Sequence, residues 1–378
     1  MRSRIWLSSP HMGGAEINYV NEGFETNWIA PLGPNVNGFE QDLESYLLEG
    51  RRVVSVSSGT AAIHLALILA GVSEVDEVLC QSFTFVATAN PIIYLGAKPV
   101  FIDSELKTWN MCPNALEAAI KDRISKGKKP KAIIVVHLYG MPAKIDEIYI
   151  IANKYEITLI EDAAEALGST YKNQKCGTFG DFGILSFNGN KIITTSGGGA
   201  LICKNSEDKQ RAIYLATQAR DYAVHYAHTE IGYNYRMSNI LAGIGRGQME
   251  VLDIHIGLRR AMNKFYQELF KEVAGITVFI EPTEVYFSNN WLSCILIDPN
   301  ITGFTSEDLR IHLEASNIES RPLWKPMHLQ PVFKEAAHYG GTVAESLFKN
   351  GLCLPSGSNL TNTDRARINS SIQKMITL

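Results

Sequence analysis

The chain has 378 residues, of which 46% are hydrophobic and 20% are charged, and its net charge at pH 7 is −4. This length allows two domains with large buried cores, and the composition is that of an ordinary soluble protein. The slightly acidic balance gives no basic surface for nucleic acid, and no apolar run reaches the ~20 residues that a membrane-spanning helix needs. We therefore expect neither a nucleic-acid partner nor a membrane.

The cysteines and the start of the chain give further exclusions. Six cysteines are scattered along the sequence, with no CxxC pair and no histidine cluster near them. This pattern argues against a zinc site and against a disulfide framework, and it suits a reducing cytoplasm. The first ten residues lack the apolar core of a signal peptide. The sequence therefore predicts a cytoplasmic protein without a metal site.

Residues 10–50 are predicted to form two amphipathic helices with a loop between them. Apolar residues recur at helical spacing over 16–26 and 36–48. The loop between the helices is rich in Pro and Gly and carries an apolar pair, Trp28 and Ile29. The pair could line a substrate site or simply pack, and the sequence does not decide between these. On the first reading, Ile29 and the next residue, Ala30, are candidate substrate contacts.

Residues 53–71 have the pattern of a strand, a turn of small residues and a helix. Ser57, Ser58, Gly59 and Thr60 lie where the new helix leaves its first amides unpaired, which makes a ready site for an anion. The alternative is an ordinary Ser or Thr N-cap, which this stretch alone favours. The motif is neither a Walker loop nor GxGxxG, which disfavours a nucleoside triphosphate or a dinucleotide.

Strands and helices continue to alternate over residues 77–155. Strands are expected at 77–80, 98–103 and 131–140, and helices at 89–95, 113–124 and 145–155. Phe85 follows the first of these strands. An aromatic side chain at a strand end can stack on a planar ring, although by itself Phe85 is better read as a core residue.

Two further strand ends carry ionisable side chains. The apolar-rich strand over 157–160 delivers Glu161 and Asp162 at its carboxyl end, the edge where open α/β sheets bind ligands. A carboxylate there can pair with a protonated ring nitrogen, or it can simply stabilise the start of a helix.

The strand over 182–187 leads to a turn, Asn188-Gly-Asn190, and then to Lys191 and a second β-rich run over 192–195. A partly desolvated lysine can form a Schiff base, because burial disfavours the charged ammonium. This stretch alone favours a solvated loop lysine.

The remainder of the chain changes character near residue 250. A strand and a helix are expected over 200–215, followed by a segment rich in Tyr, Asn and Arg over 218–240 and one long helix over 241–270. From about residue 275 the pattern is α+β, with strands near 276–280 and 291–297 and helices near 306–314 and 364–377. We therefore expect a large α/β domain over 1–250 and a smaller α+β domain over 251–378.

The separate signals become specific when they are combined. Alternation from 53 to 203 predicts a mainly parallel sheet, and the candidate groups all lie at strand ends. An anion cradle at Gly59 and Thr60, a ring stacker at Phe85, a carboxylate at Asp162 and an amine at Lys191 together suit pyridoxal phosphate.

Six motifs are distributed along the chain: Ser58-Gly-Thr-Ala-Ala62, Ser82-Phe-Thr-Phe85, Glu161-Asp-Ala-Ala164, Ser186 five residues before Lys191, Gly232-Tyr-Asn-Tyr-Arg236 and Arg321-Pro-Leu-Trp-Lys-Pro-Met-His328. Through these motifs, and over essentially its whole length, the chain resembles the DegT/DnrJ/StrS-type sugar-nucleotide aminotransferases, which have the fold of aspartate aminotransferase. The resemblance implies a seven-stranded, mainly parallel sheet between helices, with a smaller C-terminal α+β domain.

The resemblance also implies roles for individual residues. In this family, the residue matching Lys191 forms the covalent link to pyridoxal phosphate, which becomes pyridoxamine phosphate during turnover. The matching aspartate, Asp162, binds the pyridine nitrogen, and Phe85 stacks on the ring. The implied phosphate ligands are Gly59, Thr60 and Ser186, together with Asn234, which reaches in from a neighbouring subunit. The candidate substrate contacts are Ile29, Ala30, Tyr226, Arg321 and His328. A homodimer with shared sites is therefore implied.

One departure from the family pattern points to a substrate. Many members carry Gln or His at the position of Glu165, near the ring hydroxyl of the cofactor. Glutamate there, with the runs 186–195 and 321–325, resembles bacterial enzymes that transfer an amino group from glutamate to C4 of a UDP-linked 4-keto-6-deoxy-N-acetylglucosamine. Their product is a precursor of bacillosamine for protein glycans. The alternatives are a dTDP- or GDP-linked keto sugar or, in a different class, a non-catalytic regulatory protein.

Overall fold

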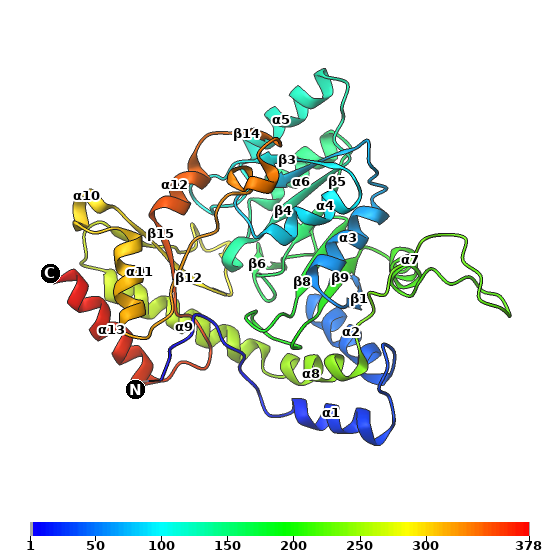
Figure 1. Cartoon of the computed structure of the whole chain (residues 1–378), viewed down its shortest axis with the longest axis horizontal. Coiled ribbons are helices and arrows are strands. Elements are labelled where there is room, and N and C mark those ends of the chain that lie inside the picture. Colours follow the sequence, from blue (N-terminus) through cyan, green and yellow to red (C-terminus); the bar gives the residue numbers. More distant parts are fainter. Residues whose placement is uncertain (1–2, 378) are drawn as a thin grey trace.

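The computed structural model describes residues 3–377. The predicted domains begin at Met1 and finish at Leu378, so Met1, Arg2 and Leu378 lie outside the described residues. The chain forms a large α/β part and a smaller part built on a second sheet (Figure 1). The large sheet has eight strands in the order β1-β9-β8-β5-β4-β2-β3-β14. Their bounds are β1 (Arg52–Val56), β9 (Gly199–Cys203), β8 (Phe182–Ser186), β5 (Thr158–Asp162), β4 (Ala132–Val136), β2 (Glu77–Gln81), β3 (Lys98–Ile102) and β14 (Ala337–Tyr339).

The pairing confirms the predicted mainly parallel sheet. Strands β8, β5, β4, β2, β3 and β14 are parallel to their neighbours in that order, whereas β9 is antiparallel to both β8 and β1. The predicted number of seven strands is wrong. The eighth strand, β14, comes from the C-terminal part of the chain and pairs with β3, whose edge would otherwise present unpaired backbone groups.

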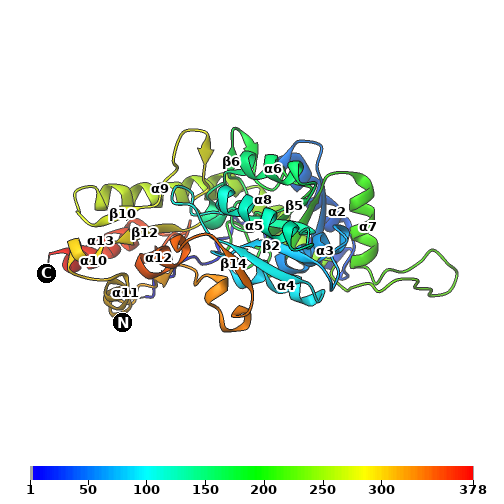
Figure 2. The ribbon, with the colours of Figure 1, turned by 90° about the horizontal axis from the view of Figure 1, so that it is seen from above.

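Helices cover both faces of the large sheet (Figure 2). Side chains of each strand alternate between the two cores, so Ile134 of β4 packs with α3 while Ile133 and Val135 pack with α5 and α6. The helices are α3 (Gly59–Leu69), α4 (Asn90–Tyr94), α5 (Pro113–Ser125), α6 (Ile145–Lys154) and α7 (Ser206–Ala216). Strands buried on both faces must be apolar throughout, which explains their Val- and Ile-rich runs.

The single long helix expected over 241–270 is two helices, α8 (Asn239–Met249) and α9 (Leu252–Phe270). The chain leaves helical geometry at Val251, where φ is −115° and ψ is 5°. Helix α8 packs through glycines on α1 (Glu16–Glu25) and α2 (Pro34–Leu47), and a Cβ at Gly245 would lie 2.7 Å from the Phe39 ring. The start of α9 shares a core with α8 through Leu252 and Ile256, whereas its later turns pack on the second sheet through Met262, Tyr266 and Phe270.

The second sheet has the order β10-β12-β15-β13 and packs against α9, α11 and α13. The predicted boundary near residue 250 falls at the break between α8 and α9, and the division into 1–250 and 251–378 stays a prediction. Two segments cross it, because Ile5 packs in the core of the second sheet and β14 joins the large one. The elements are β10 (Ile276–Val278), β12 (Ser293–Ile297), β13 (Arg321–Pro322), β15 (Gly351–Leu354), α10 (Pro299–Thr302), α11 (Ser306–Ala315), α12 (Val343–Asn350) and α13 (Asn362–Ile376).

Short elements complete the described chain. A three-stranded sheet consists of β11 (Tyr286–Phe287), β6 (Thr170–Tyr171) and β7 (Gln174–Lys175), and the 3₁₀ turns are Val86–Thr88, Leu138–Gly140, Met327–Leu329 and Pro331–Phe333. Among residues 3–377, none of the helices combines the length and the apolarity needed to cross a membrane.

The β-rich run over 192–195 is not a strand. Strand β8 is already paired with β5 on one side and β9 on the other, so the chain that leaves it has no free edge to pair with. Ile192 and Ile193 are instead buried in a loop that packs against α2 and α8. Lys191 thus begins a loop that side chains, not a sheet, must hold in place.

Candidate active site

A cavity of about 250 Å³ lies at the carboxyl ends of β5 and β8 and the start of α3. Parallel strands bring their carboxyl ends to one edge of a sheet, which is why distant segments meet here. The cavity is lined by seven of the predicted site residues, namely Gly59, Thr60, Phe85, Asp162, Glu165, Ser186 and Lys191. This edge of the large sheet therefore gathers the groups that the sequence predicted to act together.

The start of α3 has the properties of an anion site. The Ser58 hydroxyl caps the helix by accepting from the Ala61 amide at 3.0 Å, so the N-cap alternative holds for this serine. Within residues 3–377, the amides of Gly59 and Thr60 have no hydrogen-bond acceptor. A Cβ at Gly59 would lie 3.1 Å from Cβ of Ser186, which lines the same cavity. Two free amides and nearby hydroxyls can therefore hold a phosphate.

Lys191 is not a solvated loop lysine. Its side chain is 12% exposed, and its Nζ lies 3.5 Å from Oε1 of Glu165 and 4.2 Å from the centre of the Trp291 ring. An ammonium over an indole face and beside a carboxylate is held from two sides. The amine is thus fixed at the edge of the cavity.

Glu165 is buried beside this amine. Its Oε2 accepts from the Tyr139 amide at 2.6 Å, and its side chain is 5% exposed. Burial raises the pKa of Glu165 above its ordinary value, and the positive charge of Lys191 only partly opposes this. Burial therefore favours the protonated form of this carboxyl group more than in an exposed glutamate.

The neighbouring carboxylates of β5 serve different purposes, because successive side chains of a strand point to opposite faces. Asp162 faces the cavity and accepts from Oγ1 of Thr88 at 2.7 Å and from the Ala164 amide at 3.2 Å. Glu161 is fully buried and accepts from Nε2 of His137 at 2.9 Å and from three amides of the 177–180 turn. Of this pair, Asp162 belongs to the site and Glu161 holds the fold.

Aromatic side chains form one wall of the cavity. Phe85 is 48% exposed, so it is not a core residue, and its ring lies 5.2 Å from that of Trp324. Tyr139 stacks between Trp324 and Trp291, at 6.2 Å and 6.4 Å. Sequence reasoning missed these three residues, although Trp324 lies inside the quoted motif 321–328. Trp291 and Tyr139 carried no local signal, because they reach the site only through the tertiary fold.

A second cavity of about 760 Å³ shares Phe85, Asn190 and Trp324 with the first and extends toward the second sheet. Arg321 lines it, and its guanidinium donates to Oε1 of Glu319 at 2.7 Å. A polar wall opposite aromatic rings can bind a sugar or a carboxylate.

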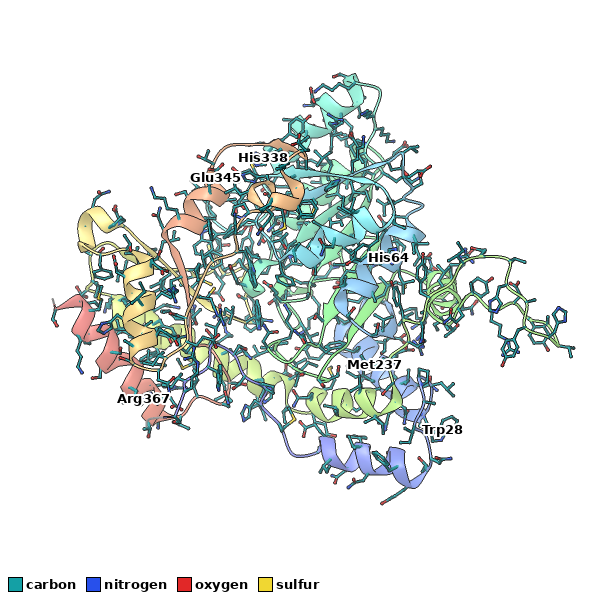
Figure 3. All side chains as sticks on the ribbon, viewed as in Figure 1. Trp28, His64, Met237, His338, Glu345 and Arg367 are labelled. Atoms are coloured by element: carbon teal, nitrogen blue, oxygen red, sulfur yellow. The ribbon has the colours of Figure 1, made fainter. Side chains whose placement is uncertain are left out.

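Five predicted contacts do not line either cavity of this single chain: Ile29, Ala30, Tyr226, Asn234 and His328. Tyr226 and Asn234 are exposed, and Figure 1 shows the segment after α7 extending away from the body of the chain. His328 is engaged elsewhere, stacked at 3.8 Å on His338 and 3.3 Å from Glu345, two residues marked together in Figure 3.

The cavity groups fit pyridoxal phosphate, the cofactor that the sequence predicts. The unpaired amides of α3 match a phosphate, Asp162 matches a ring nitrogen, and the amine of Lys191 matches an aldehyde. Among the described residues, no group of three His, Cys, Asp or Glu side chains is placed to hold a metal ion.

Comparison with known proteins agrees with this chemistry. Residues 10–373 match the DegT/DnrJ/EryC1/StrS aminotransferase family. EpsN of Bacillus subtilis (strain 168), whose name describes a pyridoxal phosphate-dependent aminotransferase, is 52% identical over 97% of this chain and 95% of its own. GDP-perosamine synthase of Escherichia coli O157:H7 is 36% identical over 98% of both chains. The crystal structure of a DegT DnrJ EryC1 StrS aminotransferase from Brucella abortus superposes with a TM-score of 0.89, at 30% identity and covering 96% of both chains.

The raised pKa of Glu165 predicts a pH-dependent stability of the cofactor-free protein. The folded state holds this proton more tightly than the unfolded chain, so the contribution is full below the ordinary pKa and is lost as pH rises through the raised one. Because glutamine cannot ionise, the melting temperature of Glu165→Gln minus that of wild type should grow as the pH rises above the ordinary glutamate pKa of about 4. Thermal unfolding with Glu25→Gln, an exposed position, as the control would measure this. A difference that stays flat or shrinks would contradict the raised pKa.

Proposed function

Because the chain belongs to the DegT/DnrJ/EryC1/StrS aminotransferase family, we propose that it transfers an amino group from glutamate to C4 of a UDP-linked 4-keto-6-deoxy-N-acetyl-hexosamine. The chain is a pyridoxal phosphate-dependent sugar aminotransferase, and the nucleotide, the sugar and the amino donor are the proposed part. We further propose that it works in the cytoplasm, in the synthesis of a bacillosamine-type sugar. The free state of all six cysteines supports this location.

The observation that carries the choice of substrate is Glu165 beside Lys191, with 3.5 Å between their charged atoms. A carboxyl group at this position, where many relatives of this type have Gln or His, is the feature that resembles the UDP-sugar enzymes. The second cavity beside Phe85 and Trp324 offers room for a sugar nucleotide.

When bound, pyridoxal phosphate supplies an aldehyde for amines and a ring that accepts the electrons released at a substrate carbon. We propose that Lys191 forms the covalent link and then moves a proton at its Nζ between donor and acceptor atoms. Asp162 would keep the ring nitrogen protonated. Thr88 orients the Asp162 carboxylate by donating to its Oδ2. Phe85 covers the ring and excludes water from that face.

The phosphate would be held by the α3 amides with Thr60 and Ser186, and by Asn234 of a second copy of this chain. The segment that carries Asn234 supports the proposed homodimer, because it leaves its own site and exposes Tyr222 and Ile231 fully or nearly so. Exposed apolar side chains on and after α1, among them Phe24 and Ile29, also suit an interface. In this arrangement Ile29, Ala30 and Tyr226 would contact the substrate of the neighbouring subunit.

A GDP-linked keto sugar is the second candidate substrate. It is favoured by the names of three relatives, the GDP-perosamine synthases of Escherichia coli O157:H7, Caulobacter vibrioides and Vibrio cholerae, at 32–36% identity. The reaction type is the same for both candidates, so the distinction lies in the nucleotide and sugar contacts.

A panel of keto sugars tests the proposed substrate. Purified protein, glutamate and UDP-, GDP- or dTDP-linked 4-keto sugars should give an aminated product, read by mass, with the UDP-linked N-acetyl-hexosamine converted fastest. Heat-treated protein is the control. Preferential conversion of the GDP-linked sugar would replace the proposal with its alternative.

Replacing Lys191 tests the proposed catalytic amine. Lys191→Ala should fold, bind the cofactor without a covalent link and lose turnover by orders of magnitude, because both the link and the proton carrier are removed. Absorbance and single-turnover assays measure the two effects. A variant with more than about a tenth of the wild-type rate would exclude this role, since one proton-transfer role alone is worth roughly 100-fold.

Subunit mixing tests the shared site. The alternative that Asn234 caps the next helix is wrong, because Ser238 caps α8 by accepting from the Leu241 amide. Two inactive variants, Lys191→Ala and Asn234→Ala, should regain activity when their subunits exchange, since the hybrid has one site with both residues intact. Activity that never exceeds that of Asn234→Ala after demonstrated exchange would show that the residue does not act across subunits.

A further inference from the structure

Arg259 of α9 is a buried cation that the proposed reaction does not use. Its side chain is 1% exposed, and among the described residues it forms no ion pair with a carboxylate. Desolvation lowers its pKa to about 9. Removing an ion from water without an opposite charge is costly, so a guanidinium at this position requires an explanation.

The guanidinium is surrounded by neutral acceptors from four segments. Nη1 donates to the carbonyl of Trp291 at 2.7 Å and to that of Ser356 at 3.4 Å. Nη2 donates to Oγ of Ser8 at 3.0 Å and to the carbonyl of Lys191 at 3.4 Å. The two terminal nitrogens of a planar guanidinium can bind such a set, whereas an ammonium presents a point charge to fewer of these acceptors. The buried Nε of Arg259 has no acceptor among the described residues.

Two of these partners act on the residue just before Lys191. The Asn190 carbonyl accepts from Oγ of Ser8 at 2.7 Å and from Nε1 of Trp291 at 2.6 Å. Arg259 is therefore connected to the Asn190–Lys191 turn by three routes. One is direct, at the Lys191 carbonyl, and the other two pass through Ser8 and Trp291. The same tryptophan ring lies 4.2 Å from Nζ of Lys191, so the network extends to the reactive amine.

The two histidines that lie near Arg259 do not add a positive charge to this network. His11 and His255 stack at 4.6 Å beside Arg259, and their pKa values are lowered, that of His255 to about 4. Burial is the first cause, and the guanidinium charge contributes, so both rings are neutral near pH 7.

We propose that Arg259 is a positioning residue, whose guanidinium holds the Asn190–Lys191 turn so that the Lys191 amine stands ready to capture the cofactor aldehyde. The turn needs such a clamp because the 192–195 run has no strand partner. Capture forms a C=N bond between Nζ and the aldehyde carbon and releases one water, without oxidation or reduction. The inference rests on the proposed role of Lys191 and is independent of the identity of the sugar.

The rate of cofactor capture tests the proposal. Cofactor-free Arg259→Lys and Arg259→Met proteins are mixed with pyridoxal phosphate, and the absorbance of the C=N link is followed at a temperature where circular dichroism shows them folded. Capture should slow about tenfold or more, because small misplacements of a reacting group are costly. The matched control is Arg260→Met, whose guanidinium pairs with Glu281 at 2.5 Å, and it should stay within about twofold of wild type.

A second measurement separates positioning from a general structural role. In a Lys191→Ala background the cofactor binds only without a covalent link, and adding Arg259→Lys should leave its affinity within about twofold. A mere structural brace would weaken this affinity as well. Wild-type capture rates in a folded Arg259 variant, an equal loss in both measurements, or failure of both variants to fold would each overturn the proposal.

Mapping the link by borohydride reduction and mass spectrometry distinguishes a failure of the proposed Lys191 role from a failure of the proposed Arg259 role. A link at Lys191 with unchanged Arg259 variants would remove only the inference about Arg259. A wild-type link at another lysine would remove the proposed role of Lys191 and, with it, this inference.

Discussion

The pairing of β8 on both sides is the constraint on which the site depends. Strand β5 on one side and β9 on the other leave no edge for a hairpin, so the chain after Ser186 must turn away from the sheet and stay there as a loop. Backbone bonds tie the ends of the loop to Phe187, through the Thr195 amide and the Gly198 carbonyl, and side chains hold the part between them. Gln248 accepts from the Thr194 amide at 3.1 Å, and Trp291 donates to the Asn190 carbonyl at 2.6 Å. The amine that carries the chemistry is therefore placed by tertiary contacts from both parts of the chain.

Burial of charge is handled in three ways around this loop. Glu161 is satisfied by a histidine and three backbone amides, which makes it a structural anion. Glu165 has one amide and the Lys191 amine, and burial raises its pKa above the ordinary value. Arg259 donates only to carbonyl and hydroxyl oxygens, and no carboxylate competes with them for its guanidinium. A fully satisfied charge stabilises a fold, whereas a partly satisfied one remains available for a reaction.

The sequence was sufficient for groups that local patterns position, and insufficient for those that tertiary packing positions. Strand ends and the start of α3 follow from hydrophobic pattern and small residues, so Gly59, Asp162 and Lys191 could be identified in advance. The pattern alone placed both Glu161 and Asp162 at the strand end, and the family resemblance selected Asp162; the physical reason is that only Asp162 lies on the face of β5 that meets the cavity. Arg259 lies in a helix with an ordinary amphipathic pattern, and nothing in that pattern distinguishes a buried arginine from an exposed one.

The same distinction explains the errors in the predicted elements. The run over 192–195 has strand composition, but composition cannot report that the neighbouring edges are occupied. The helix over 241–270 has a continuous helical period, and that period does not report the break at Val251, where φ is −115° and ψ is 5°. The eighth strand has three residues, too few for a periodic signal, and it exists because β3 offers an edge.

The anion site at the start of α3 is built from one chain, and its outer side is open to solvent. Gly59 and Thr60 offer two amides, while Asn234, only a few residues from the turn that starts α8, points into solvent in the single chain. A phosphate has more acceptor positions than two amides and two hydroxyls can fill, so a further donor from a neighbouring copy would complete it. If that copy supplies the donor, cofactor and partner bind cooperatively, because each stabilises the state that the other recognises. The exposed apolar residues of α1 and of the segment after α7 would then be buried by the same event that completes the site.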